Sequence, residues 1–481
     1  MPILQLSNEL IHEILVKAIL CRGVKRGLRL RLVCKKFNEL MQPALFASRL
    51  LDTYDMPRTD WLWHIPTQSG GSRLWHAYFL YRCKNETNPG MGHFCDIRRL
   101  AAQVAAEESC PETANADSIL EALCWLALGK RMSSFTSTRI ITADSFSTSA
   151  SLLSAAAHFN MVALAERLLH EGASPADEEH IFPPAIQVAA MAGHGAMLEL
   201  FQRNLPQEPF AKATARTRSE QAAWDTRTGT SSIEGAAIRG DLELLKLALR
   251  PFASDDDSSG GNPPAEGWEE TINPWQVVQF AQWNSASPET FDYLQSWLPG
   301  TLPGNDTDSQ LARYAELGRV DMVRHLVIQV GVSVDGGLWD TGRHDNPLAN
   351  ACRHGHEEVV DFLLSRGAII DNSEEDDRDS ALPAAAAGGS LALVRKLIDH
   401  GAPLDTIPAL QAIREAIMLE HTEMLQLLLE RCDFPHPSED YHQHIRGPYT
   451  QSARSEGLDS MVEILEAWSE ANPPVEEYVT E

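Results

Sequence analysis

The sequence predicts an all-α protein whose larger part is a helical solenoid. Two segments, 351–368 (ACRHGHEEVVDFLLSRGA) and 385–402 (AAAGGSLALVRKLIDHGA), align without a gap, 34 residues apart. Small residues, a glycine turn, a β-branched position, an aliphatic pair and a closing Gly-Ala recur in register. A unit of this length cannot bury its apolar face alone, so neighbouring units stack into a solenoid. Solenoids mostly bind other proteins, which favours interaction over catalysis.

The repeat frame extends in both directions from its turn glycines, Gly355 and Gly389. The further turn positions are Asn160, Gly193, Gly240, Gly318, Glu420 and Gly457, and one degenerate unit fits around residues 275–298. Each unit is expected to hold helices, because its apolar residues recur with a helical period. We therefore predict about nine imperfect repeats over residues 146–470.

The best unit is preceded by a turn with a motif of its own. Residues 346–351 read NPLANA, and Pro347 suits the first position of a helix because its missing N–H would be unpaired there. Gly172, Gly367 and Gly401 end second helices in the left-handed conformation that glycine enters cheaply. With these features the units resemble ankyrin repeats, although the Thr and His of that family's Thr-Pro-Leu-His-x-Ala turn are mostly missing.

The ankyrin resemblance implies where a client protein binds. In that family partners lie across the first-helix surface and the hairpin tips, which here gives the client-binding residues Trp339, Arg343, His344, Asn350 and Arg353. Insertions at 203–230, 252–273 and 371–379 are expected at hairpin tips. Acidic residues at 374–377 suggest a client with a basic patch, although such charge runs usually form solvated loops.

The first 50 residues form a head of different character. After Ser7 or Asn8, which can cap a helix, apolar residues follow at a helical period. They are Leu10, Ile11, Ile14, Leu15, Ala18 and Ile19. A Cys-Arg-Gly break comes next, and a second apolar stripe then runs through Leu28, Leu32, Val33, Phe37 and Leu40. Both helices are short and one-sided, so they need a partner to be stable.

The head resembles an F-box through Leu6, Glu9-Leu10 and Ile14-Leu15, followed by RLVCKKF at 31–37. This resemblance implies docking onto the acidic Skp-type adaptor of cullin-based ubiquitin ligases. It implies these adaptor-binding residues: Leu10, Ile14, Leu15, Val33, Cys34 and Phe37. Ser7 stands where the family usually has proline. The alternative is a plain amphipathic hairpin that closes the end of the solenoid.

Residues 51–145 are expected to form a helical connector. Their aromatic residues Trp61, Trp63, Trp75, Tyr78 and Tyr81 are more typical of a core than of a ligand cage. The order of the segments 74–83, 97–107 and 120–130 resembles the connector of filamentous-fungal proteins that carry an F-box before ankyrin repeats. We interpret the segment as a spacer between head and solenoid.

Charge and composition narrow the classes of partner. The chain has a net charge of −27, but the first 50 residues hold nine lysines and arginines against three glutamates. An acidic body argues against nucleic acid as the main ligand, and the basic head requires an acidic partner. No secretory signal or membrane span is evident, and the eight cysteines include no CxxC pair. These features favour an intracellular protein, cytoplasmic or nuclear, without disulfides.

Motifs of catalysis are missing from the sequence. It has no phosphate-binding GxxxxGK loop, no zincin helix and no GxSxG elbow. Four possible zinc ligands, Cys432, His436, His442 and His444, lie within thirteen residues, but their spacings match no common zinc finger. We therefore expect no enzymatic activity, no cofactor and no metal, with a zinc site as the alternative.

The sequence thus predicts four parts: an F-box-like domain (1–50), a helical connector (51–145), an ankyrin solenoid (146–470) and an acidic C-terminal tail (471–481). The predicted function is that of a substrate-receptor subunit of a cullin-type ubiquitin ligase. In this interpretation the head binds the adaptor and the repeats hold the client. The alternative is a non-catalytic ankyrin scaffold or regulator in a fungal biosynthetic or transcriptional pathway.

Overall fold

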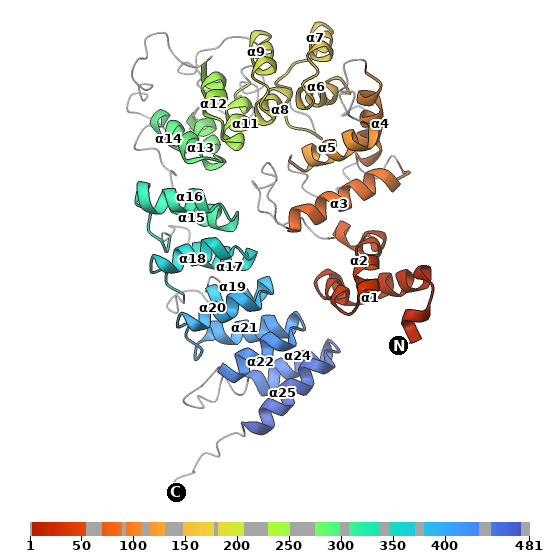
Figure 1. Cartoon of the computed structure of the whole chain (residues 1–481), viewed down its shortest axis with the longest axis vertical. Helices are drawn as coiled ribbons and strands as arrows, with labels where there is room; N and C mark the ends of the chain where they lie inside the picture. The colour runs from red at the N-terminus through yellow and green to blue at the C-terminus, as the bar shows by residue number, and fades with distance from the viewer. Residues whose placement is uncertain are drawn as a thin grey trace. The chain divides into compact units, whose positions relative to one another are not determined.

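The computed structural model describes most of the chain, and its regular structure there is entirely helical. The described residues are 2–53, 70–88, 93–107, 115–129, 148–177, 181–205, 229–250, 275–298, 307–336, 346–370, 380–431 and 444–472. They divide between two compact units. The first unit comprises Met1–Cys21 with Asn38–Asn305, and the second comprises Arg22–Phe37 with Asp306–Glu481. The predicted all-helical class is confirmed for the described part (Figure 1).

The head begins with α1 (Asn8–Arg29), which is interrupted at Gly23. Gly23 has φ 76° and ψ 173°, a backbone conformation that is nearly restricted to glycine, so the helix breaks there. The 3₁₀ turns Pro2–Gln5, Leu30–Leu32 and Leu50–Thr53 and the helix α2 (Lys35–Ser48) complete the head.

Three helices follow the head in the first unit: α3 (Gly70–Asn85), α4 (Phe94–Ala105) and α5 (Ala116–Gly129). Their aromatic side chains pack inward, since Trp75 and Tyr78 are buried and the rings of Phe79 and Phe94 lie 5.2 Å apart. The prediction of an aromatic core is confirmed at Trp75 and Tyr78. Tyr81 is half-buried, and Trp61 and Trp63 lie outside the described residues.

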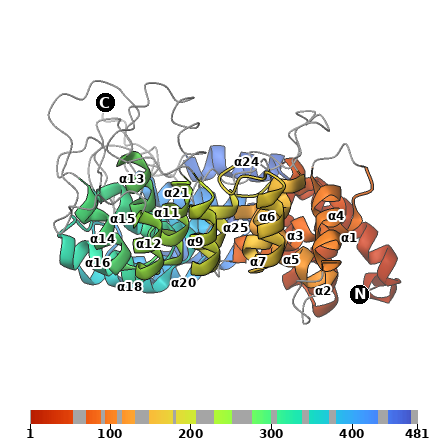
Figure 2. The same cartoon turned by 90° about the horizontal axis from the view of Figure 1, so that it is seen from above.

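The rest of the first unit consists of stacked helix pairs (Figures 1 and 2). The pairs are α6 (Thr148–His158) with α7 (Val162–His170), α8 (Ala185–Ala192) with α9 (Gly195–Arg203), α11 (Ser231–Arg239) with α12 (Leu242–Leu249), and α13 (Trp275–Trp283) with α14 (Pro288–Trp297). The first helices pack closely, because a Cβ at Gly235 would lie 2.5 Å from the carbonyl oxygen of Gln187.

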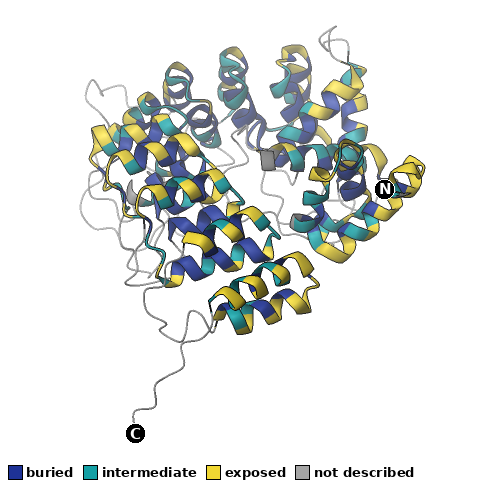
Figure 3. Cartoon of the chain, turned by 60° about the horizontal axis from the view of Figure 1, so that its bottom comes forward, coloured by how far each residue is buried: buried dark blue, intermediate teal, exposed yellow. Residues whose placement is uncertain are grey.

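The second unit continues the same arrangement. Its pairs are α15 (Thr307–Glu316) with α16 (Val320–His325) and a π-helical turn (Leu326–Val330), α17 (Pro347–His354) with α18 (Glu357–Ser365), α19 (Ala381–Gly388) with α20 (Leu391–Asp399), α21 (Ile407–Met418) with α22 (Thr422–Arg431), and a π-helical turn (Ile445–Tyr449) and α24 (Thr450–Ser455) with α25 (Asp459–Ala471). The faces between neighbouring pairs are buried, and the outward faces and turns are exposed (Figure 3).

The spacing found in the sequence also appears as a physical contact. The backbone N–H of Ile369 donates to the carboxylate of Asp335, 34 residues earlier, at 2.7 Å. Within the described pairs other than α13 with α14, the turn residue has a left-handed backbone, with φ 76° at Gly355 and φ 75° at Gly389. The next N–H then bonds back across the helix end, as from His356 to the carbonyl of Ala351 at 3.0 Å.

Candidate interaction surfaces

The predicted client surface begins at α17, whose start is fixed by the NPLANA motif. The side chain of Asn346 accepts a hydrogen bond from the N–H of Ala349 at 3.1 Å, and Pro347 occupies the first turn of the helix. This cap satisfies a donor that the first helical turn would otherwise leave open. The motif therefore fixes where α17 begins and which side chains it presents.

The five predicted client-binding residues have different places. Arg353 is exposed on α17. Asn350 is half-buried, and its amide donates to the carbonyl of Ala312 on α15 at 3.4 Å, so it also joins neighbouring repeats. Trp339, Arg343 and His344 lie outside the described residues, as do the acidic residues at 374–377.

A histidine cluster beside Arg353 was not predicted from the sequence. His356 Nε2 donates to the carbonyl of Glu316 at 2.8 Å, and His354 Nε2 lies 3.5 Å from a carboxylate oxygen of the same residue. Burial, with the nearby charges of His356 and Arg353, lowers the pKa of His354 to about 4. Burial also lowers the pKa of His356. Both imidazoles are therefore neutral at pH 7.

A sequence signal for this contact exists in the recurring Gly-His pair. His194 follows the turn glycine Gly193 as His356 follows Gly355, and its Nε2 likewise reaches a carbonyl of the preceding repeat, that of His158, at 3.2 Å. A histidine after the turn glycine thus ties one unit to the unit before it. Its function is structural.

The head presents three of its six predicted adaptor-binding residues to solvent. Leu10 is 54% exposed, Ile14 is 39% exposed and Val33 is 57% exposed. Leu15 and Phe37 are buried in the core of their own units, and Cys34 is half-buried, its sulfur accepting from the N–H of Phe37 at 3.4 Å. Leu32, which was expected on the second apolar stripe but not as a contact, is 73% exposed.

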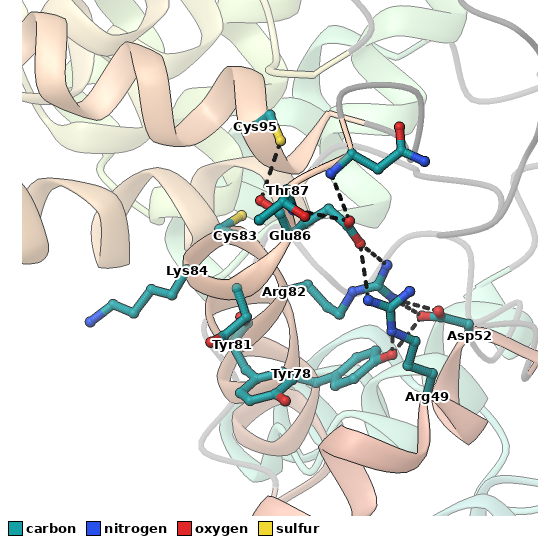
Figure 4. Close-up of polar contacts among 12 residues, drawn as sticks. Arg49, Asp52, Tyr78, Tyr81, Arg82, Cys83, Lys84, Glu86, Thr87 and Cys95 are labelled. Atoms are coloured by element: carbon teal, nitrogen blue, oxygen red, sulfur yellow. Dashed lines mark hydrogen bonds and ion pairs between the residues drawn. The ribbon is translucent and has the colours of Figure 1, made fainter.

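A buried charged network joins the end of the head to α3 (Figure 4). The carboxylate of Asp52 accepts from the hydroxyl of Tyr78 at 2.6 Å and pairs with the guanidinium of Arg82. The same guanidinium donates to Glu86 at 2.9 Å, and Arg49 reaches Glu86 at 3.5 Å. Along the chain of contacts Asp52–Arg82–Glu86–Arg49, negative and positive groups therefore alternate.

Because the network is buried, removing one charged group would leave its partner buried without a counter-charge. Arg82 is only 2% exposed, so its charge is compensated by protein groups rather than by water. The pKa of Glu86 is raised by burial but more strongly lowered by the N–H of Asn88, by Arg82 and by Arg49. Glu86 is therefore ionised at neutral pH. Arg82 and Glu86 lie one helical turn apart on α3, but Asp52 comes from a segment 30 residues before Arg82. No motif links the two segments, so sequence reasoning missed the network.

The zinc alternative is not supported in the described chain. No group of three or more His, Cys, Asp and Glu side chains there could hold a metal ion. Of the four candidate ligands, His444 is described and exposed, whereas Cys432, His436 and His442 lie outside the described residues. Among the described helices, none combines the length and the apolar character needed to cross a membrane.

Comparison with known proteins identifies the repeats. A family model for ankyrin repeats (three copies) matches residues 310–407. The ankyrin repeat and KH domain-containing protein mask-1 of Caenorhabditis elegans is 33% identical over 258 residues, which cover 52% of this chain and 8% of that protein. The crystal structure of the human ASB11 ankyrin repeat domain matches at 20% identity and a TM-score of 0.33, covering 52% of this chain and 98% of that one.

The chain thus spans only a small part of the curated relative that it matches. The family model falls on α15 to α20 and the first residue of α21, the region that contains the 34-residue spacing. Ankyrin-repeat proteins are typically non-catalytic interaction scaffolds. The chain therefore contains ankyrin repeats, and these indicate a role in protein–protein interaction.

Proposed function

We propose that the chain is a substrate-receptor subunit of a cullin-type ubiquitin ligase. Its head docks onto a Skp-type adaptor, and its ankyrin repeats hold the client. The observation that carries the proposal is the exposed apolar surface of the head. The F-box resemblance of residues 6–37 gives that surface its partner.

The exposed apolar surface lies on a helix that already has a core face. Ile11, Leu15 and Ile19 are buried, which accounts for the apolar stripe that stabilises the head. Leu10 and Ile14, four residues apart, share another face of the helix and remain exposed. Exposed apolar side chains that adjoin one another are a feature of protein-binding sites.

Charge also supports a partner at the head. Lys17 on α1 is exposed, and Arg31 and Lys35 are exposed close to Leu32 and Val33 in sequence. Exposed apolar and cationic side chains within one short segment, residues 31–35, fit a partner whose surface is apolar and acidic. The acidic Skp-type adaptor that the F-box resemblance implies has that chemistry.

The client side of the proposal rests on Arg353 and on the hairpin tips. Trp339, Arg343 and His344 remain predicted contacts. Asn350 remains one as well, and its amide also donates to the carbonyl of Ala312 and so joins α17 to α15. The acidic sequence at 374–377 leads us to propose a client with a basic patch.

A second candidate, a scaffold without a ligase role, is favoured by a different observation. Arg22, Arg26 and Arg29 are engaged with acidic and carbonyl groups of the chain's own second unit. Part of the head's positive charge is thus accounted for without an acidic adaptor. The two candidates differ in whether the apolar surface at Leu10 and Ile14 binds anything.

Titration calorimetry of the full-length protein with a purified Skp-type adaptor separates the candidates. Leu10→Asp with Ile14→Asp should weaken binding about a hundredfold, because each change puts a charge into an apolar interface. The matched control is Val162→Asp, which alters an exposed apolar residue of α7 outside the head. If the wild-type chain does not bind the adaptor at tens of micromolar, the scaffold function replaces the proposal.

A further inference from the structure

Two repeat turns have a left-handed residue other than glycine, Asn160 and Glu420. Gly355 and Gly389 end their first helices with a left-handed backbone, and Glu420 does the same after α21 with φ 54°. A residue with a Cβ is disfavoured in this conformation, and glutamate lacks the short side chain by which asparagine tolerates it. A strained residue of this kind persists when the surrounding structure holds it in place, and such residues cluster at functional contacts.

The side chain of Glu420 has a distant partner within the second unit. Its carboxylate forms an ion pair with the guanidinium of Arg22, from the segment Arg22–Phe37 that belongs to this unit. The carboxylate is 17% exposed, so the pair is partly withdrawn from water. Burial lowers the pKa of the neighbouring Arg29, whereas the charge of Glu420 raises it.

Two further arginines of the same segment donate hydrogen bonds to the end of α21. Arg26 Nε donates to the carbonyl of Met418 at 3.1 Å, and Arg29 donates to the carbonyl of Leu419. The last carbonyls of a helix lack partners within the helix and carry its negative partial charge. The guanidinium groups of Arg26 and Arg29 therefore donate hydrogen bonds to these carbonyls, and their positive charge stabilises the negative end of the helix.

A second carboxylate lies at the next turn. Arg26 Nη1 pairs with Glu456 at 3.0 Å, and the arginine side chain is only 12% exposed. Glu456 directly precedes Gly457, the turn glycine of the following helix pair. Three arginines thus meet two carboxylates and two carbonyls at consecutive repeat turns.

We propose that Glu420, Glu456 and the carboxyl end of α21 form a docking site for the basic segment 22–29 of the same chain. The segment and the site act as an ionic latch. The acidic partner that the basic head requires is, for these three arginines, the chain's own last repeats. The latch does not depend on the proposed ligase function, because Leu32 and Val33 stay exposed with the segment docked.

Hydrogen exchange of the full-length protein, followed by mass spectrometry on peptides covering residues 22–32, tests the latch. Glu420→Gly relieves the backbone strain while removing the carboxylate. If the latch exists, exchange in residues 22–32 should be roughly tenfold faster, since a partly buried charged hydrogen bond is lost. If Glu420 is only a degenerate turn residue, Glu420→Gly leaves the exchange of this segment unchanged, which overturns the proposal.

Two control variants, Glu423→Gln and Arg31→Gln, show whether a change in exchange is specific to the contacts of the latch. Glu420→Gln retains the size of the side chain and should give the same acceleration, whereas Glu423→Gln, an exposed acid on α22, should not. On the arginine side, Arg26→Gln should accelerate exchange and Arg31→Gln should not. Equal effects of Arg26→Gln and Arg31→Gln would contradict the latch. Peptides across residues 422–431 report whether the repeat itself stays folded.

Discussion

Gly355 shows how a single residue fixes the repeat turn. Its φ of 76° lies in the left-handed region, and no atom lies within 4 Å of the position of a Cβ. The demand for glycine is therefore one of backbone conformation and not of space. Because the turn recurs in register, the sequence frame predicted this position, along with Asn160 and Glu420, which also have positive φ.

Gly355→Ala should destabilise the protein by about 1 kcal/mol, the usual penalty for a left-handed alanine. Gly195→Ala is the matched control, because Gly195 lies in the first turn of α9 and a Cβ there would meet only leucine methyl groups at 3.7–3.8 Å. That change should be neutral or stabilising by roughly 0.5 kcal/mol. Urea midpoints measure both, and equal shifts would show that conformation does not explain the glycine.

The aliphatic pair of α18 divides between core and surface. Leu363 is fully buried and Leu364 is half-buried. Leu363→Ala should therefore cost about 2–5 kcal/mol, and Leu364→Ala less. The loss should spread to α17–α20, since stacked repeats are stabilised by their neighbours. Hydrogen exchange in which each pair opens independently of this mutation would contradict such coupling.

Burial of individual head residues was only partly predictable. Periodicity placed Leu10, Ile14 and Leu15 on one helix, and this helix exists. Which side of the helix faces the core depends on contacts with segments distant in sequence. Leu15 consequently lies in the core, while Leu10 and Ile14 are exposed.

At the scale of elements, the Asp52–Arg82–Glu86 network holds the end of the head on α3. Arg82 lies between two carboxylates, and its guanidinium stacks over the ring of Phe94 at 4.7 Å. The sequence predicted the helix but not the network, because Asp52 comes from a segment 30 residues before Arg82. The ion pairs and the hydrogen bond from Tyr78 to Asp52 thus link residues 49–52 to α3.

Arg82→Met should destabilise the first unit by about 3–5 kcal/mol, because Asp52 and Glu86 would be left buried without their cation. Arg99→Met is the control: Arg99 also pairs with an acid, Asp96 at 3.2 Å, but its side chain is 70% exposed. Its loss should change stability by no more than about 1 kcal/mol. Chemical unfolding that gives the two variants the same midpoint would show that burial of the network is not stabilising.

From the lowered pKa of His354 we predict that the stability of the helix pair α17–α18 depends on pH. In the folded state His354 has a pKa of about 4, against an ordinary value of 6.5 in the unfolded chain. Between pH 6.5 and about pH 4, His354 is protonated in the unfolded chain but neutral in the folded chain. The free energy of unfolding therefore decreases as the pH falls through this range.

His354→Asn should therefore lessen the loss of stability between pH 7 and pH 5. Thermal unfolding at several pH values measures the effect. The same slope in the wild-type protein and the variant would rule out His354 as its source. Burial lowers the pKa of His356 and His158 as well, so some pH dependence should remain in the variant.

For the whole molecule, the sequence predicted the solenoid well because repetition is visible without any knowledge of three-dimensional contacts. Spacing and turn glycines identified helix pairs from α6 to α25. The contacts of Arg22, Arg26 and Arg29 with residues some 390–430 positions away could not be predicted, because no local pattern records them. The positive charge of the head is visible in the sequence, whereas its partner within the chain is not.

We propose that one chain joins a ligase adaptor to a client through separate surfaces. Affinity purification of the tagged full-length protein from its source cells, followed by mass spectrometry, tests this claim most directly. The wild-type chain should recover a Skp-type adaptor and a cullin together with the client. Leu10→Asp with Ile14→Asp should lose the adaptor and cullin while keeping the client, and Val162→Asp should lose neither. Recovery of a client without adaptor or cullin by the wild-type chain would contradict the claim.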